Sequence, residues 1–190
     1  MIGIVNYGAG NIFSLTAALD RLKIDYGMIN DQRAFDLYGH IIIPGVGHAG
    51  SAMNKLHESG LAQPISQLKQ PVLGICVGMQ LLTAFSEEGS TDLLNIMPIR
   101  TLHFDRQLAK KVPHMGWNSI SPKKDSVIFQ DIADKSYFYF VHSYYIEADQ
   151  RYTAATCHYG TDFSAAIQNE NFFGVQFHPE KSGVVGEQLL

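Results

Sequence analysis

Cys76 lies in the segment Gly74-Ile75-Cys76-Val77-Gly78, where an apolar run ends and a helical pattern begins. A cysteine bracketed by glycines at such a junction is typical of a nucleophile elbow, a tight strand-to-helix turn. The positive end of the helix favours a thiolate, and the Val77 N–H would point toward a developing oxyanion. The alternative is a small buried thiol, a common role for a free cysteine. Cys157, in an apolar run without flanking glycines, is expected to be structural.

His178 and Glu180 form a second reactive pair, separated by Pro179. Side chains two positions apart in an extended chain leave on the same side, and proline biases the preceding residue toward that conformation. Glu180 would then orient the imidazole, whose other nitrogen takes the thiol proton. A surface turn, a solvated glutamate and half of a metal site are the alternatives. The two cysteines form no ligand pair, so we expect a Cys76–His178–Glu180 triad and no metal.

The loop Pro44-Gly45-Val46-Gly47 follows the apolar run at residues 40–43. Glycines let the backbone approach a ligand closely and turn a peptide N–H toward it. We therefore expect the Val46 N–H to be a second oxyanion donor beside that of Val77. An ordinary proline–glycine turn is the alternative for this loop.

The elements that must position these groups alternate between short apolar runs and helical patterns. We expect strands at residues 2–6, 25–30, 40–43 and 71–76, and helical segments containing Leu15 and Leu19, Met53 and Leu56, and Met79, Leu82 and Phe85. This alternation predicts an α/β fold with an open, mostly parallel sheet and helices on both faces. Further strands, at 101–104, 136–141, 152–158, 165–168 and 173–177, predict an antiparallel extension. Sites in such sheets form at the carboxyl ends of the strands.

Length and composition favour one domain spanning residues 1–190 and exclude several functions. The net charge of −4 argues against a nucleic-acid partner. The N-terminus lacks a signal-peptide pattern, and no apolar run reaches the ~18 residues of a membrane span. Two cysteines make no disulfide framework, so we expect a cytoplasmic protein with reduced thiols. Arg106, Lys110 and Lys111 form a small basic cluster, expected to be a solvated loop.

The loop at 44–47, the elbow extended to Gln80 and the run Phe177-His178-Pro179-Glu180 together resemble the class I, triad-type glutamine amidotransferases. The resemblance implies a flavodoxin-like sheet and hydrolysis of L-glutamine without a cofactor. It implies that Cys76 attacks the side-chain amide, while His178 transfers the proton and Glu180 orients it. Positions that hold the ends of glutamine are matched by Gly47, Gln80, Ser143 and Tyr144.

Two further motifs, NYGAGN at residues 6–11 and PHMGWN at 113–118, resemble those of glutaminase subunits of histidine biosynthesis. This implies a heterodimer with a (β/α)8 cyclase, which uses channelled ammonia to make imidazole glycerol phosphate and an aminoimidazole carboxamide ribotide. Positions that face this partner are matched by Asn11, Trp117, Tyr139 and Lys181. A glutaminase acting alone would waste glutamine, so we expect the Gly45–Val46 peptide to turn its N–H inward only when the partner binds.

Three other functions fit parts of the pattern. A paralogous subunit would feed ammonia to another acceptor, such as a surface sugar, because the acceptor binds on the partner. A cysteine hydrolase of related fold would share the elbow but generally lacks the His-Pro-Glu run and the Met79–Gln80 pair. A non-catalytic regulatory subunit would be expected to have lost part of the triad, and all three members are present.

Overall fold

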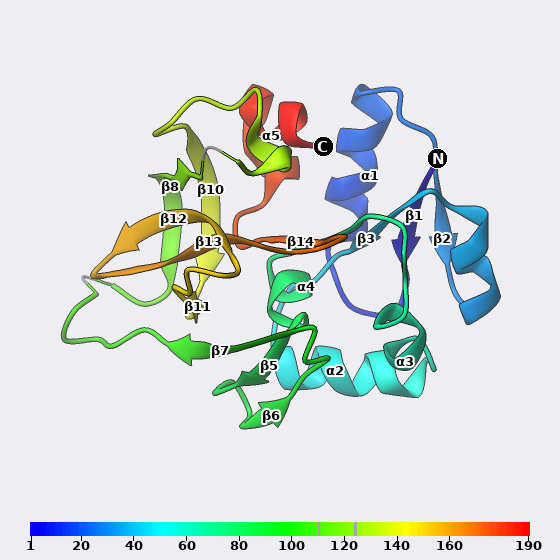
Figure 1. Cartoon of the computed structure of the whole chain (residues 1–190), viewed down its shortest axis with the longest axis horizontal. Helices are drawn as coiled ribbons and strands as arrows, with labels where there is room; N and C mark the ends of the chain where they lie inside the picture. Colours follow the sequence, from blue (N-terminus) through cyan, green and yellow to red (C-terminus); the bar gives the residue numbers. More distant parts are fainter. Residues whose placement is uncertain (110, 124) are drawn as a thin grey trace.

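A long mixed β-sheet forms the centre of the molecule, and one half of it is parallel (Figure 1). The computed structural model describes residues 1–109, 111–123 and 125–190, so Lys110 of the expected basic loop lies outside the described residues. The parallel strands are ordered β2-β1-β3-β4-β14, a flavodoxin-like order. Their bounds are β1 Ile2–Val5, β2 Tyr26–Ile29, β3 His40–Ile43, β4 Val72–Ile75 and β14 Phe172–Val175.

An antiparallel extension continues the sheet from β14 through β13, β11 and β7. Strand β5 then pairs with β7 in parallel, and β6 closes the edge. The remaining strands are β5 Thr83–Ser86, β6 Thr91–Asp92, β7 Met97–His103, β8 His114–Ser119, β9 Ser121–Pro122, β10 Tyr137–His142, β11 Tyr144–Glu147, β12 Thr153–Tyr159 and β13 Thr161–Asn169. Strands β12 and β9 extend from β13, whereas β8 and β10 form a separate antiparallel pair.

Helices cover both faces of the parallel half (Figure 1). Helices α1 and α5 lie on one face, and α2, α3 and α4 on the other. Their bounds are α1 Ile12–Arg21, α2 Ala49–Glu58, α3 Ala62–Ile65, α4 Val77–Gln80 and α5 Gly183–Leu189, with 3₁₀ turns at Gln32–Leu37, Val127–Phe129 and Pro179–Lys181. The predicted α/β class, with its parallel sheet and antiparallel extension, is confirmed. Within the described residues, no helix has the length and apolar character to cross a membrane.

The predicted helix through Met79, Leu82 and Phe85 is wrong beyond its first turn. Helix α4 ends at Gln80, and Phe85 lies in strand β5. The Thr83 hydroxyl donates to the Gln80 carbonyl at 2.8 Å, which ends the helix, and the chain then pairs with β7. β-Branched and aromatic residues such as Thr83 and Phe85 favour this pleated environment. The periodicity of the apolar residues alone did not distinguish the two structures.

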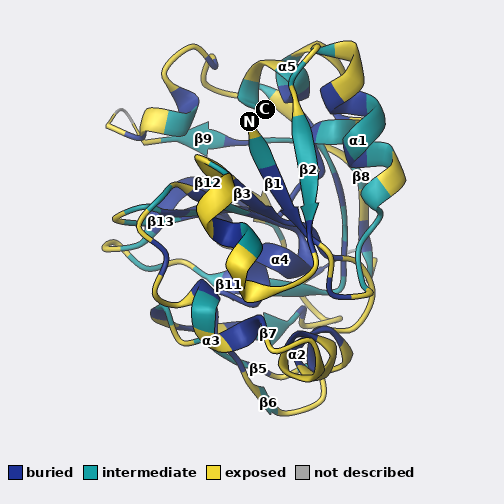
Figure 2. Ribbon diagram, turned by 90° about the vertical axis from the view of Figure 1, so that its right-hand side faces the viewer, coloured by how far each residue is buried: buried dark blue, intermediate teal, exposed yellow. Residues whose placement is uncertain are grey.

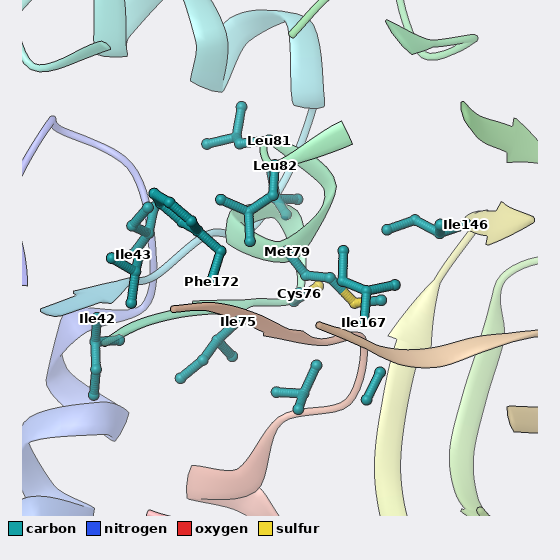
Figure 3. Packing of buried hydrophobic residues seen from close by; sticks show 14 of the residues in the cluster. Ile42, Ile43, Ile75, Cys76, Met79, Leu81, Leu82, Ile146, Ile167 and Phe172 are labelled. Carbon is teal, nitrogen blue, oxygen red and sulfur yellow. The ribbon is translucent and has the colours of Figure 1, made fainter. Parts of the chain in front are cut away.

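The core is tightest where the elbow meets the sheet. Strands β1 and β3 are almost entirely buried, whereas the helices expose their outer faces (Figure 2). Around Cys76, the side chains of Ile75, Met79 and Ile167 pack together (Figure 3). A Cβ on Gly74 would lie 2.5 Å from the Gly78 carbonyl oxygen, and one on Gly78 would overlap the carbonyl of Ile43. Only glycine therefore allows strands β3 and β4 and helix α4 to approach this closely.

Replacing Gly78 with alanine should lower the free energy of unfolding by about 1–3 kcal/mol, the usual cost of overpacking a buried site. No side-chain movement can accommodate the added methyl group, because the atom that it would contact belongs to the backbone. Urea denaturation measures the change. Gly39→Ala is the matched control, since nothing lies within 4 Å of its added Cβ. Equal stability of the two variants would show that the helix can move away from the sheet.

Candidate active site

Cys76 occupies the turn between β4 and α4 in a strained conformation. Its φ of 55° and ψ of −110° lie where L-residues are rarely found. The backbone holds it there: the Cys76 N–H donates to the Val175 carbonyl at 2.8 Å, and its carbonyl accepts from the N–H groups of Met79 and Gln80. The predicted strand-to-helix elbow at Cys76 is therefore the observed backbone geometry.

His178 and Glu180 follow β14, the strand next to β4. The Nδ1 of His178 lies 2.8 Å from the Glu180 Oε1, and both side chains are almost completely buried. The His178 backbone is fixed as well, because its N–H donates to the Tyr139 carbonyl at 2.9 Å and its carbonyl accepts from the Ser182 hydroxyl at 2.6 Å. Glu180 therefore sets the tautomer and orientation of the imidazole, leaving Nε2 as the free nitrogen.

One cavity of about 340 Å³ brings the predicted groups together. Cys76 and His178 both line it. So do the expected oxyanion residues Val46 and Val77 and the expected substrate residues Gly47, Gln80, Ser143 and Tyr144. These residues come from four separate parts of the sequence and meet at the carboxyl ends of the parallel strands, as the fold predicts.

The surroundings of His178 raise the pKa of its ring and differ between its two nitrogens. Burial lowers the pKa of His178, but the adjacent Cys76 sulfur and the Glu180 carboxylate outweigh it and raise the pKa to about 10. Among the described residues, no hydrogen-bond partner occupies Nε2. The site therefore stabilises the imidazolium form of His178 next to the Cys76 sulfur.

Cys157 behaves differently, as expected. It is buried in β12, and this burial raises the pKa of its thiol to about 12. A thiol that stays protonated is neither a nucleophile nor a metal ligand. Within the described residues, no cluster of three or more His, Cys, Asp or Glu side chains is arranged to hold a metal ion.

Gln176 is a polar residue that sequence reasoning missed. It is fully buried, its Nε2 donates to the Cys76 sulfur at 3.7 Å, and its Oε1 accepts from the Gln80 Nε2 at 3.1 Å. The signal was a glutamine in the apolar run Gly174-Val175-Gln176-Phe177, where a buried polar group needs a partner.

The four expected partner-facing residues come from separate elements, and three of them have contacts with, or lie in, the loop that carries His178 and Glu180. Asn11 lines a small cavity with Glu180, although its side chain also caps α1 by bonding Ser14. The rings of Trp117 and Tyr139 pack edge to face, with their centroids 6.2 Å apart. Lys181 directly follows Glu180 and is exposed. The structure thus places Asn11, Tyr139 and Lys181 next to triad residues, and Trp117 beside Tyr139.

Comparison with known proteins decides the family. The family model described as "Glutamine amidotransferase class-I" matches residues 4–189. The chain belongs to the class-I glutamine amidotransferases. It is 45% identical over 190 residues to the "Imidazole glycerol phosphate synthase subunit HisH" of Bacteroides fragilis (strain YCH46), covering 100% of this chain and 96% of the relative. The protein of the same name from Pasteurella multocida (strain Pm70) is 46% identical, with 100% and 94% covered.

Solved structures share the fold of this amidotransferase. PurLQS from Thermotoga maritima aligns with a TM-score of 0.73 at 18% identity, covering 99% of this chain and 94% of that one. A glutamine amidotransferase from the same organism aligns with a TM-score of 0.67 at 16% identity, covering 94% and 75%. At such identities the likeness concerns the fold alone.

Glu88 is a second residue that sequence reasoning missed. It is the only carboxylate among the described residues that line the cavity. Its Oε2 accepts from the Ala49 N–H at 2.6 Å, at the start of α2, which fixes the side chain. A carboxylate is the group that pairs with an α-ammonium, so we expect Glu88 to bind that end of a free amino acid. The sequence shows the acidic pair Glu87-Glu88 but not which member faces the cavity.

Glu180→Gln in the amidotransferase should lower kcat for glutamine hydrolysis by roughly 10²- to 10⁴-fold, the usual contribution of a well-oriented general base. The amide keeps the size of the side chain but removes the charge that stabilises the imidazolium. Steady-state kinetics measure the effect, with Glu58→Gln, at an exposed position of α2, as the control. An unchanged kcat would show that His178 needs no carboxylate.

Glu88→Gln should raise KM for glutamine by roughly 10- to 100-fold with little change in kcat, because a charge-assisted hydrogen bond to bound substrate is lost. Glu87→Gln is the matched control: the neighbouring carboxylate binds the His103 N–H and does not line the cavity. Equal KM values for the two variants would remove Glu88 from the binding site.

Proposed function

We propose that this chain is the glutaminase subunit of an imidazole glycerol phosphate synthase, and that residues 1–190 form one glutaminase domain. It hydrolyses L-glutamine to glutamate and delivers the ammonia to a (β/α)8 cyclase. The observation that carries the proposal is the cavity in which Cys76, His178 and residues suited to an amino acid meet. The sequence identity of 45–46% over the full chain to subunits of that synthase supports the cyclase as the recipient of the ammonia.

The first half-reaction uses the Cys76–His178 pair. The Nε2 of His178 takes the thiol proton, and the thiolate attacks the side-chain carbonyl carbon of glutamine. The resulting oxyanion is stabilised by the N–H groups of Val46 and Val77, each worth on the order of 10²–10³ in rate. When the intermediate collapses, the C–N bond breaks and the imidazolium returns its proton to the leaving nitrogen, so that ammonia departs and a thioester remains on Cys76.

The second half-reaction hydrolyses this thioester. His178 takes a proton from a water molecule, the oxygen attacks the thioester carbonyl, and glutamate leaves as Cys76 regains its proton. Gly47, Gln80, Ser143 and Tyr144 hold the ends of the substrate throughout. The Oε1 of Gln80 is buried and has no partner among the described residues, so it is free to accept a hydrogen bond from glutamine.

The cyclase docks on the surface formed by Asn11, Trp117, Tyr139 and Lys181. Exposed aromatic side chains of this kind are enriched at protein interfaces, and Trp117 is 55% exposed. The surface borders the triad, which shortens the path of ammonia. Delivery through a closed interface keeps ammonia neutral and nucleophilic, whereas in water it becomes mostly ammonium.

The oxyanion loop is arranged to respond to this partner. The Tyr7 hydroxyl donates to the Pro44 carbonyl at 2.7 Å, and Gly45 packs against the backbone of Gly78. Gly47, by contrast, has a φ of 88° and open space around it. The loop is therefore anchored at its start, whereas Val46 and Gly47 are exposed, which supports a rotation of the Gly45–Val46 peptide on docking.

We also place the reaction in the cytoplasm. The mechanism requires Cys76 as a free thiol, and both cysteines are unpaired in the structure. Thiols stay reduced in that compartment.

Cys76→Ala, tested in the complex with a histidine-pathway cyclase, should lower glutamine-dependent synthesis by more than roughly 1000-fold. Synthesis from added ammonia should continue, because the cyclase does not need the nucleophile. Product formation from each nitrogen source measures this separation, and Cys157→Ala is the matched cysteine control.

Two results would contradict the proposal. Loss of ammonia-dependent synthesis in a well-folded Cys76→Ala complex would show that the two activities are not divided as described. A wild-type chain that hydrolyses glutamine but forms no complex with the cyclase would favour another acceptor, such as a surface sugar.

A further inference from the structure

Two buried histidines outside the triad lie directly beside the glutamine cavity. His114 begins strand β8, His142 ends strand β10, and the two face each other in the antiparallel pair. The Nδ1 of His114 lies 2.9 Å from the Nε2 of His142. Both side chains are buried, and His142 lines the cavity. The proposed mechanism uses neither of them.

The hydrogen-bond partners of the two histidines determine which ring nitrogens carry a proton. The Nδ1 of His142 lies 2.7 Å from the Tyr144 carbonyl, which only accepts, so Nδ1 carries a proton. At the other end, the Asn118 Oδ1 accepts from the Ser119 N–H, so the Asn118 Nδ2 donates to the Nε2 of His114 at 3.2 Å. His114 therefore donates from Nδ1 to the Nε2 of His142. The hydrogen bonds run in one direction from Asn118 to Tyr144.

The chain ends at the corner that carries the expected substrate residues. Residues 142–144 lead from the β8–β10 pair into the large sheet, and Ser143 and Tyr144 line the cavity. The Tyr144 carbonyl accepts from His142 and also from the Gln80 Nε2 at 3.3 Å. Two donors on one carbonyl fix this corner relative to α4, which carries Gln80.

We infer that His114 and His142 are positioning residues for the glutaminase reaction: as two neutral imidazoles in a one-way chain of hydrogen bonds, they hold the Ser143–Tyr144 corner in the shape that binds glutamine. This inference rests on the proposed function, since it assigns a role in the same cavity. A proton added to either ring would place two donors face to face, so the chain also keeps both rings uncharged.

Neutrality has a direct benefit at this place. His142 is close enough to His178 for their charges to interact, and His178 becomes an imidazolium during the reaction. Burial lowers the pKa of His114 to about 4, and burial together with the neighbouring His114 lowers that of His142 to about 3. A second positive ring would oppose protonation of the catalytic base.

Two substitutions of His114 separate hydrogen bonding from packing. The ring of His114 stacks between Phe140 and Tyr159, at 4.9 and 4.0 Å. His114→Phe keeps this packing and removes the donor. His114→Asn loses the ring but keeps an N–H donor at the δ position. Each variant is assayed in the complex with the cyclase, for glutamine KM and kcat, ammonia-dependent synthesis and thermal unfolding.

His114→Phe should raise KM for glutamine about five- to tenfold, the effect of losing about one hydrogen bond, with kcat and ammonia-dependent synthesis near wild type and a somewhat lower unfolding temperature, because the buried Nε2 of His142 loses its donor. His114→Asn should keep a near-wild-type KM and unfold at a lower temperature. The inference is overturned if His114→Asn raises KM as much as His114→Phe does, or if neither variant raises it.

A third variant keeps the test decisive if His114→Phe fails to fold. Asn118 is only half-buried, and Asn118→Asp replaces the donor on His114 with an acceptor of the same size. This change requires a proton on the Nε2 of His114. A neutral His114 would then lose its Nδ1 donor and KM should rise by a similar factor, whereas a doubly protonated His114 would oppose protonation of His178 and lower kcat. An unchanged KM together with an unchanged kcat in Asn118→Asp would overturn the inference. Absence of glutamine hydrolysis by the wild-type complex would instead refute the proposed function.

Discussion

The close approach of strand β3, strand β4 and helix α4 is the constraint on which the site depends. It exists because Gly74, Gly78 and Gly45 have no side chains to hold these segments apart. The same approach forces Cys76 into its strained backbone conformation and brings the oxyanion loop against the elbow. Burial of the surrounding apolar side chains supplies the free energy that maintains this strain. The reactive geometry is therefore a property of the sheet as a whole.

Near this elbow, backbone hydrogen bonds do most of the positioning of the catalytic residues. His178 is held through its own N–H and carbonyl, and Tyr139 supplies the acceptor from a strand outside the main sheet. The Ser182 hydroxyl also accepts from the Tyr139 N–H, which ties this strand and the catalytic loop together. A partner that contacts the Tyr139 ring therefore presses on the strand that supports the base.

The sequence was sufficient for the parallel half of the fold and for predicting the triad, because both leave local signals. Gly74, Cys76 and Gly78 are close together in the chain, as are His178 and Glu180. Residues whose role arises from contacts between distant segments were missed. Glu88 reaches the cavity only because β5 replaces the expected helix, and Gln176 matters through its contact with Cys76. Strands β8 and β11 were missed too.

The burial of His178 and Glu180 imposes an order on the steps of catalysis. With both side chains almost fully enclosed, a single nitrogen, Nε2 of His178, must serve the departing ammonia and the incoming water in turn. The two small molecules compete for one place, so ammonia must vacate it before hydrolysis of the acyl-enzyme can begin. Slow removal of ammonia would then slow the release of glutamate. The rate of the reaction that consumes ammonia would therefore limit the rate of glutamine hydrolysis.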